Sequence, residues 1–128
     1  MYCSSSLEIS KLLIEHGADV NSKDLYGYTP LISSVIKDYK EIVDLLLKNK
    51  ANVNDRTNDT FTALVYAKSK EVAELLIKYG SNIDEKLKYG FTPLMLTNNK
   101  EIAELLIKHG ANLNAKTEDG KTPLMYAL

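Results

Sequence analysis

The sequence predicts an all-α fold, a linear array of short helix pairs, and three observations carry this prediction. Two different landmarks, one Glu-led and one Thr-led, recur along the chain with the same spacing. Each landmark has the composition of a helix start followed by an amphipathic helix. Glycine follows most of the Glu-led segments, where a helix needs a left-handed cap. A repeat of about 30 residues indicates a solenoid, in which each helix pair buries its apolar face against the next pair.

The longer helix of each pair is predicted from the Glu-led segments. Ile42, Leu45 and Leu46 stand at i, i+3 and i+4, the period of an amphipathic helix. The leading glutamate recurs at intervals of 33, 30 and 30 residues, as Glu8, Glu41, Glu71 and Glu101.

The shorter helix is predicted from the Thr-led segments, where threonine caps the free N–H groups and proline fits the first helical position. These segments are Thr29-Pro30-Leu31, Thr62-Ala63-Leu64, Thr92-Pro93-Leu94 and Thr122-Pro123-Leu124. From Thr29 to Glu41 the spacing is 12 residues, but the next two units have only 9. The sequence therefore predicts that the end of the first helix and its turn are shortened in those two units.

The segments that join the helix pairs carry a family resemblance. Gly17-Ala18-Asp19-Val20-Asn21 leads to Thr29-Pro30-Leu31, and Gly110-Ala111-Asn112-Leu113-Asn114 leads to Thr122-Pro123-Leu124. This pattern resembles the ankyrin repeat over essentially the whole chain. The resemblance implies antiparallel helix pairs, projecting β-hairpin fingers, and a concave face made by the fingers and first helices. A tetratricopeptide array, the main rival, lacks both motifs.

The predicted array is a single domain over residues 1–128. It has a partial first unit at 1–24 with only a rudiment of a first helix in residues 1–6. Full units follow at 25–57, 58–87 and 88–117, with a partial last unit at 118–128. The finger at residues 50–63 departs most from the pattern, because Lys50 and Thr60 replace glycines and Ala63 replaces proline. A left-handed non-glycine residue costs about 1–2 kcal/mol. The finger is therefore expected to be rebuilt or soft, either by degeneration or as a specialised binding loop.

The composition of the chain indicates which classes of partner and which location to expect. The formal net charge is −1, with 16 basic and 17 acidic residues, and Arg56 is the only arginine. Nucleic-acid binding needs clustered basic excess, so no nucleic-acid partner is expected. One cysteine, no signal-peptide pattern and no membrane-length apolar run predict a cytoplasmic or otherwise intracellular protein without membrane insertion. The protein is expected to be monomeric.

Catalytic and metal chemistry find little support. His16 and His109 occupy the same place in two repeats and are interpreted as helix-end cations rather than ligands or bases. Cys3, near three serines, has no identifiable partner base. We therefore predict no catalytic residues, no metal, no cofactor and no enzyme activity.

The finger tips hold the candidate binding residues, because the ankyrin resemblance implies that variable finger positions contact partners. Aromatic residues are also favoured in binding hot spots. The candidates are Leu25, Tyr26, Tyr28, Asp59, Phe61, Lys88, Tyr89, Phe91 and Lys121. The alternative is that the aromatics before each Thr only pack along the neighbouring finger. The exposed edge of the short helices is the second candidate surface, with Ser34, Lys37, Lys68 and Asn98.

The predicted function is a non-catalytic module that binds a protein or peptide through the concave face. Two alternatives stay open: a structural spacer in a longer ankyrin-repeat protein, and an accessory array of an enzyme whose catalytic domain lies elsewhere.

Overall fold

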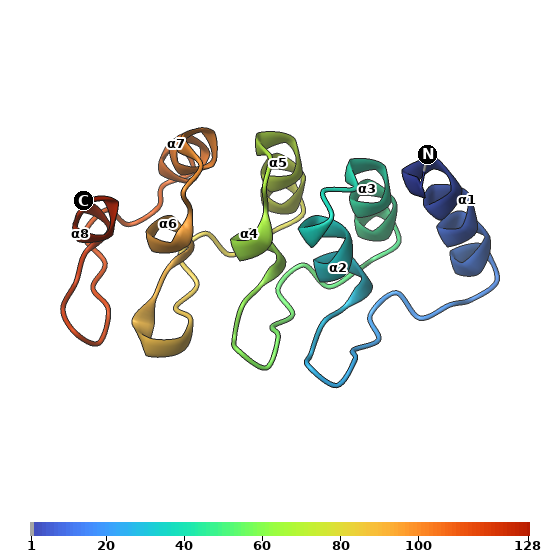
Figure 1. The fold of residues 1–128 in the computed structure, drawn as a ribbon, viewed down its shortest axis with the longest axis horizontal. Helices are drawn as coiled ribbons and strands as arrows, with labels where there is room; N and C mark the ends of the chain where they lie inside the picture. The colour runs from blue at the N-terminus through green and yellow to red at the C-terminus, as the bar shows by residue number, and fades with distance from the viewer. Residues whose placement is uncertain (1) are drawn as a thin grey trace.

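A computed structural model describes residues 2–128, which form a row of helix pairs (Figure 1). The α-helices are α1 (Tyr2–Glu15), α2 (Pro30–Ile36), α3 (Lys40–Lys48), α4 (Ala63–Tyr66), α5 (Lys70–Lys78), α6 (Pro93–Leu96), α7 (Lys100–Lys108) and α8 (Pro123–Ala127), with a 3-10 turn η1 (Lys88–Gly90) between α5 and α6.

The helices stack in two rows. The long helices α1, α3, α5 and α7 pack one against the next, and the short helices α2, α4, α6 and α8 form a second row. Four loops project from the short-helix side: residues 16–29, 49–62, 79–92 and 109–122, here called the first to fourth fingers. The short helices therefore lie between the long helices and the fingers.

The shortening predicted for the middle units is confirmed. α2 has 7 residues, whereas α4 and α6 have 4 each. The rudimentary first helix expected in residues 1–6 is wrong for the described residues. From Tyr2 onward this segment continues into α1 as one helix, since neither glycine nor proline interrupts it.

The predicted threonine cap holds only at α2. There the Thr29 hydroxyl accepts a hydrogen bond from the Ile32 amide at 3.2 Å. The shorter α4 and α6 begin with a tighter turn, in which the backbone carbonyl of Thr62 or Thr92 accepts the amide three residues on. The hydroxyls of both threonines are consequently buried without a partner, and Thr122 forms no side-chain cap either.

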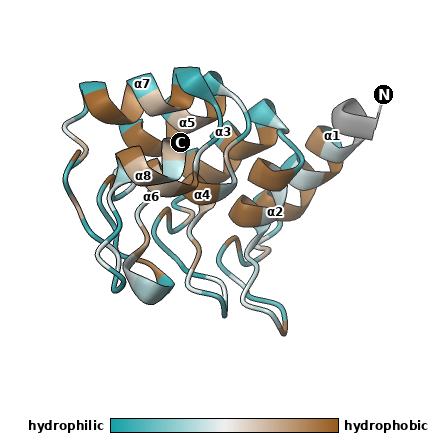
Figure 2. Ribbon diagram, turned by 60° about the vertical axis from the view of Figure 1, so that its left-hand side comes forward, coloured by the Kyte–Doolittle hydropathy of each residue, from teal (hydrophilic) through white to brown (hydrophobic). Residues whose placement is uncertain are grey.

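The hydrophobic core lies between the two helical rows. Figure 2 shows the hydrophobic residues gathered on the helices, while the fingers are largely hydrophilic. Leu31, Val43, Leu76, Ile102 and Leu106 are almost completely buried. Each such side chain contributes about 1.5–3 kcal/mol relative to an exposed position. No helix in residues 2–128 is long and apolar enough to cross a membrane.

The fingers are turns rather than the expected β-hairpins, which are not confirmed: residues 2–128 contain no strand. In the first finger the Asp24 amide donates to the Tyr28 carbonyl at 3.0 Å, as in a hairpin. The returning Tyr28 amide donates to the Asp24 carboxylate instead of a backbone carbonyl. Thr57 and Thr117 accept the corresponding amides with their hydroxyls. In the first, second and fourth fingers, side chains therefore take the bonds that would extend a strand ladder, and in the third the Phe91 amide donates to the Lys88 carbonyl.

The unusual second finger keeps the backbone of its neighbours. Lys50 has a φ of 69° and Thr60 a φ of 71°, so both adopt the left-handed conformation of the glycines at these places. Of the two alternatives, a rebuilt finger is therefore not seen at these positions, and both residues carry left-handed strain.

A hydrogen-bond ladder that the sequence analysis missed links the bases of successive fingers. Asn21, Asn54 and Asp84 occupy the same repeat position. Their side-chain oxygens accept the backbone amides of Asn52, Asn82 and Asn112 at 2.6–2.9 Å. The regular Asn or Asp at this place was visible in the sequence, but its long-range partner was not.

Candidate partner-binding site

The structure spreads the predicted site residues over all four fingers. Leu25 and Tyr26 lie at the tip of the first finger and are 90% and 68% exposed. Lys121 is exposed on the fourth finger. These three residues therefore do not join the group formed by the second and third fingers.

The aromatic residues that precede each threonine are half-buried. Tyr28 and Phe61, from the first and second fingers, both pack against Tyr66 at the end of α4, with ring centroids 6.1 Å and 5.9 Å away. Phe91 packs in the same way against Tyr126 of α8, at 5.1 Å. These aromatics have a structural role in addition to any contact with a partner.

Tyr66 and Tyr126 are also part of this surface, and the sequence analysis included neither among the candidates. Each stands four residues after the threonine that precedes its helix, about one helical turn further on. Leu96 occupies the same place in α6. This spacing was a usable signal, since one turn brings the side chain back to the finger side.

Burial raises the pKa of the Tyr66 hydroxyl to about 12, and the neighbouring Tyr28 hydroxyl adds to the increase. The hydroxyl of Tyr66 therefore stays protonated well above the ordinary titration range of tyrosine.

A pocket of about 350 Å³ lies between the second and third fingers. Its lining residues are Asp59, Phe61, Lys88, Tyr89, Phe91 and Leu96, most of them predicted from the sequence. Phe61 and Phe91 reach it from the finger bases, whereas Tyr89 is 59% exposed. Tyr89 has a φ of 62°, so a non-glycine residue holds a left-handed conformation at this site. Such strain is concentrated at functional sites in proteins.

The charged side chains around this pocket differ in the partners that they contact. The Lys88 ammonium lies 5.3 Å from the centre of the Tyr89 ring. Arg56, on the second finger, forms an ion pair with Glu85 on the third. Asp59 forms no ion pair with any described residue. Its carboxylate is the acidic group at the pocket that is left for a ligand.

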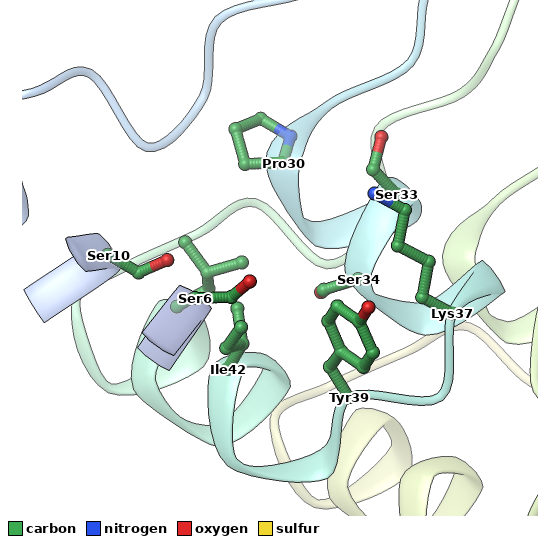
Figure 3. Close-up of a pocket in the computed structure, with 9 residues that line it drawn as sticks. Ser6, Ser10, Pro30, Ser33, Ser34, Lys37, Tyr39 and Ile42 are labelled. Atoms are coloured by element: carbon green, nitrogen blue, oxygen red, sulfur yellow. The ribbon is translucent and has the colours of Figure 1, made fainter. Parts of the chain in front are cut away.

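Two residues of the second candidate surface, Ser34 and Lys37, line a pocket of about 220 Å³ beside α2 (Figure 3). Ser6 and Ser10 of α1 face Ser33 and Ser34 of α2, together with Lys37 directly after that helix, across the pocket. Ser34 was predicted to be exposed and is not: it is buried, and its hydroxyl donates to the Leu31 carbonyl at 2.8 Å. Lys68 and Asn98 are exposed on the turns that follow α4 and α6.

The described part of the chain contains no group of three or more His, Cys, Asp or Glu residues able to hold a metal ion. His16 and His109 are exposed just beyond the ends of α1 and α7, three repeats apart. No arrangement of a nucleophile with a base arises from these residues.

Comparison with known proteins settles the family. A profile described as "Ankyrin repeats (3 copies)" matches residues 1–57 and 61–128. The chain belongs to the ankyrin repeat family, whose members are generally non-catalytic and mediate contacts between proteins.

Individual relatives match only short segments. An ankyrin repeat protein of Fowlpox virus is 45% identical over 37% of this chain and 18% of its own length. The 2-5A-dependent ribonuclease of Mus musculus is 44% identical over 35% of this chain and 6% of its own. Protein phosphatase 1 regulatory subunit 27 of Homo sapiens is 39% identical over 44% of this chain and 36% of its own. The chain therefore spans much less than two thirds of each relative.

Proposed function

We propose that this chain is a non-catalytic interaction module that binds a protein or peptide through the fingers and short helices. One observation carries the proposal: two adjacent fingers bring aromatic, acidic and basic side chains around a single pocket of about 350 Å³. Aromatic residues bury a large area at a low cost in side-chain entropy, and they dominate binding energy in many interfaces.

The surroundings of the pocket suit recognition of another chain. Phe61 is fixed by Tyr66, and Phe91 by Tyr126, so both walls are ordered before a partner arrives. Preorganised side chains lose little entropy on binding. Tyr26 and Leu25 extend the exposed apolar surface along the first finger. A partner that lies across the first three fingers would contact both this apolar surface and the pocket.

A role as a spacer or accessory array is the second candidate. It is supported by the ribonuclease, in which the matched segment forms only 6% of the protein. In that case the finger surface would hold no partner of its own.

Site-specific photo-cross-linking separates the two. A photoreactive amino acid replaces Tyr89 in one variant, Lys37 beside α2 in a second, and Lys78 at the end of α5 in a third. We expect a discrete cross-linked partner from source-cell lysate only at position 89. Cross-linking at position 37 alone would move the site to the second surface. Equal, weak products at all three positions would favour the spacer role.

A further inference from the structure

The fingers are joined to one another in two different ways. Between the first and second fingers, the Asn58 amide donates to the Tyr26 carbonyl at 2.9 Å. Between the third and fourth, the Glu118 amide donates to the Tyr89 carbonyl at 3.0 Å. We call these two contacts the glycine joints, because Gly27 and Gly90 follow the accepting residues.

The contact between the second and third fingers, here called the threonine joint, lacks this backbone hydrogen bond. By position, the Lys88 amide should donate to the Asp59 carbonyl. It donates to the Thr60 hydroxyl instead, at 2.7 Å. Arg56 adds a second side-chain bridge, because its guanidinium pairs with Glu85 and donates to the Lys86 carbonyl. Side chains therefore hold together the two fingers that form the pocket.

The space available explains the difference. A Cβ atom on Gly27 would lie 2.8 Å from the Asn58 nitrogen, and one on Gly90 would lie 3.2 Å from the Glu118 nitrogen. The joint at Gly27 therefore has no room for a side chain, and at Gly90 the neighbouring backbone would have to shift to admit one. Thr60 carries a Cβ and a hydroxyl at this same place, so its side chain stands between the two backbones. The threonine is a spacer, and the pocket lies between the two fingers that it joins.

The chemistry of the pocket defines what it can hold. Phe61, Phe91 and Leu96 provide apolar walls, and the volume of about 350 Å³ is near the lower end for ligand pockets. At the rim, neither Asp59 nor Lys88 forms an ion pair with a described residue, but the Lys88 ammonium lies against the Tyr89 ring. The Asp59 carboxylate is therefore available to pair with a positive charge beside an apolar group.

We propose that Thr60 opens this pocket for one large apolar side chain of an extended peptide, and that Asp59 binds a lysine or arginine next to that side chain in the peptide. The inference rests on the proposed function and specifies its partner. Thr60 is a positioning residue in this scheme, whereas Asp59, Phe61 and Phe91 contact the peptide.

The test uses a random peptide library displayed on phage and selected on the full chain. Enriched peptides are synthesised with a fluorophore, and their dissociation constants are measured by anisotropy. We expect enriched peptides to share a large apolar residue adjacent to a lysine or arginine. Thr60→Gly should weaken binding by about tenfold or more, since a glycine joint would close the pocket. Thr60→Ser, which keeps the hydroxyl, is the matched control and should stay within about threefold of the parent.

The variant Asp59→Asn tests the contribution of the carboxylate charge independently of the apolar pocket. It should weaken the basic peptides by about five- to tenfold and leave a peptide with glutamine in place of the basic residue unchanged. Circular dichroism and urea unfolding confirm that each variant is folded, which is expected for Thr60→Gly because the other fingers carry glycine there.

Each outcome decides something. Enriched peptides that bind the parent and Thr60→Gly equally would overturn the inference and leave the proposed function standing. Peptides without the apolar–basic pair would overturn it as well. A library from which nothing is enriched would count against both the inference and the proposed function.

Discussion

At their tips, the first and second fingers are joined by a backbone hydrogen bond, beside which the Asn58 side chain donates to the Leu25 carbonyl, whereas the second and third fingers are joined there through the Thr60 hydroxyl. Gly27 and Thr60 hold the same position and the same left-handed backbone, with φ values of 84° and 71°. At Gly27 the absence of a side chain lets the next finger approach within hydrogen-bonding distance of a carbonyl. At Thr60 a hydroxyl takes over that bond and keeps the fingers apart. One substitution in a repeat can therefore convert a structural contact into a site while the fold is kept.

Closing the space at a glycine joint should have the largest effect on stability. Gly27→Ala adds left-handed strain and forces a methyl group against the Asn58 backbone. We expect the free energy of unfolding to fall by about 2–4 kcal/mol, measured by urea denaturation. Gly120→Ala is the matched control, because Gly120 has a φ of 79° with nothing within 4 Å. It should cost only about 1–2 kcal/mol. Equal losses for the two variants would contradict the close approach.

Removing the bridge at the threonine joint should have an intermediate effect. Arg56→Ala deletes the ion pair to Glu85 and the bond to the Lys86 carbonyl. Since the guanidinium is partly exposed, we expect a loss of about 1 kcal/mol in urea unfolding. Arg56→Lys, which keeps the charge but not the planar fork, should recover only part of it. A variant as stable as the parent would show that Thr60 alone holds this joint.

Relieving the left-handed backbone strain at Lys50 should raise the stability of the protein instead of lowering it. Lys50 is exposed and left-handed, where the other repeats have glycine at Gly17, Gly80 and Gly110. Lys50→Gly should therefore raise the free energy of unfolding by up to about 1 kcal/mol, because the strain exceeds the entropy cost of glycine. Thermal unfolding with the Lys48→Gly variant as a helix-end control measures this. A loss of stability on Lys50→Gly would mean that the second finger tolerates the lysine without strain.

Ionisation of Tyr66, in the aromatic contact that joins the first two fingers, should have the smallest effect on stability, because it occurs only at alkaline pH. The pKa of Tyr66 is raised from 10.0 to about 12, so the unfolded chain releases this proton before the folded chain does. Stability should therefore fall as the pH rises from about 10 to about 12, and the contribution should be fully present below pH 10. Ultraviolet titration of tyrosinate should show a component near pH 12 that disappears in Tyr66→Phe. Retention of this component would assign it to another tyrosine.

The sequence predicted the repeats, the helix order and the shortened α4 and α6, and it marked Lys50 and Thr60 as residues that stand at glycine positions. These features depend on local pattern, which one sequence carries in full. It failed at Thr62 and Thr92, whose capping hydrogen bond disappears when a helix is reduced to a single turn. The resemblance also implied hairpin strands, which are not confirmed, since side chains accept the returning amides in three of the four fingers.

The candidate site was only partly predictable. The finger positions of Phe61, Lys88 and Tyr89 followed from the repeat, but their meeting at one pocket depends on how far apart two fingers stand. That spacing is set by the bond from the Lys88 amide to the Thr60 hydroxyl, between residues 28 positions apart. The sequence marked Thr60 as an anomaly and could not show that its side chain replaces a backbone contact.

The most direct test of the central claim, that the pocket at the threonine joint is where a partner binds, is amide chemical-shift mapping by NMR. A peptide selected on the full chain is titrated into the isotope-labelled protein. We predict that the largest shifts fall on residues 59–61, 88–91 and 96, and that they are much smaller in Thr60→Gly at the same peptide concentration. Shifts centred on α2 and Lys37, or on the outer faces of α5 and α7, would contradict the account and place the site elsewhere on the array.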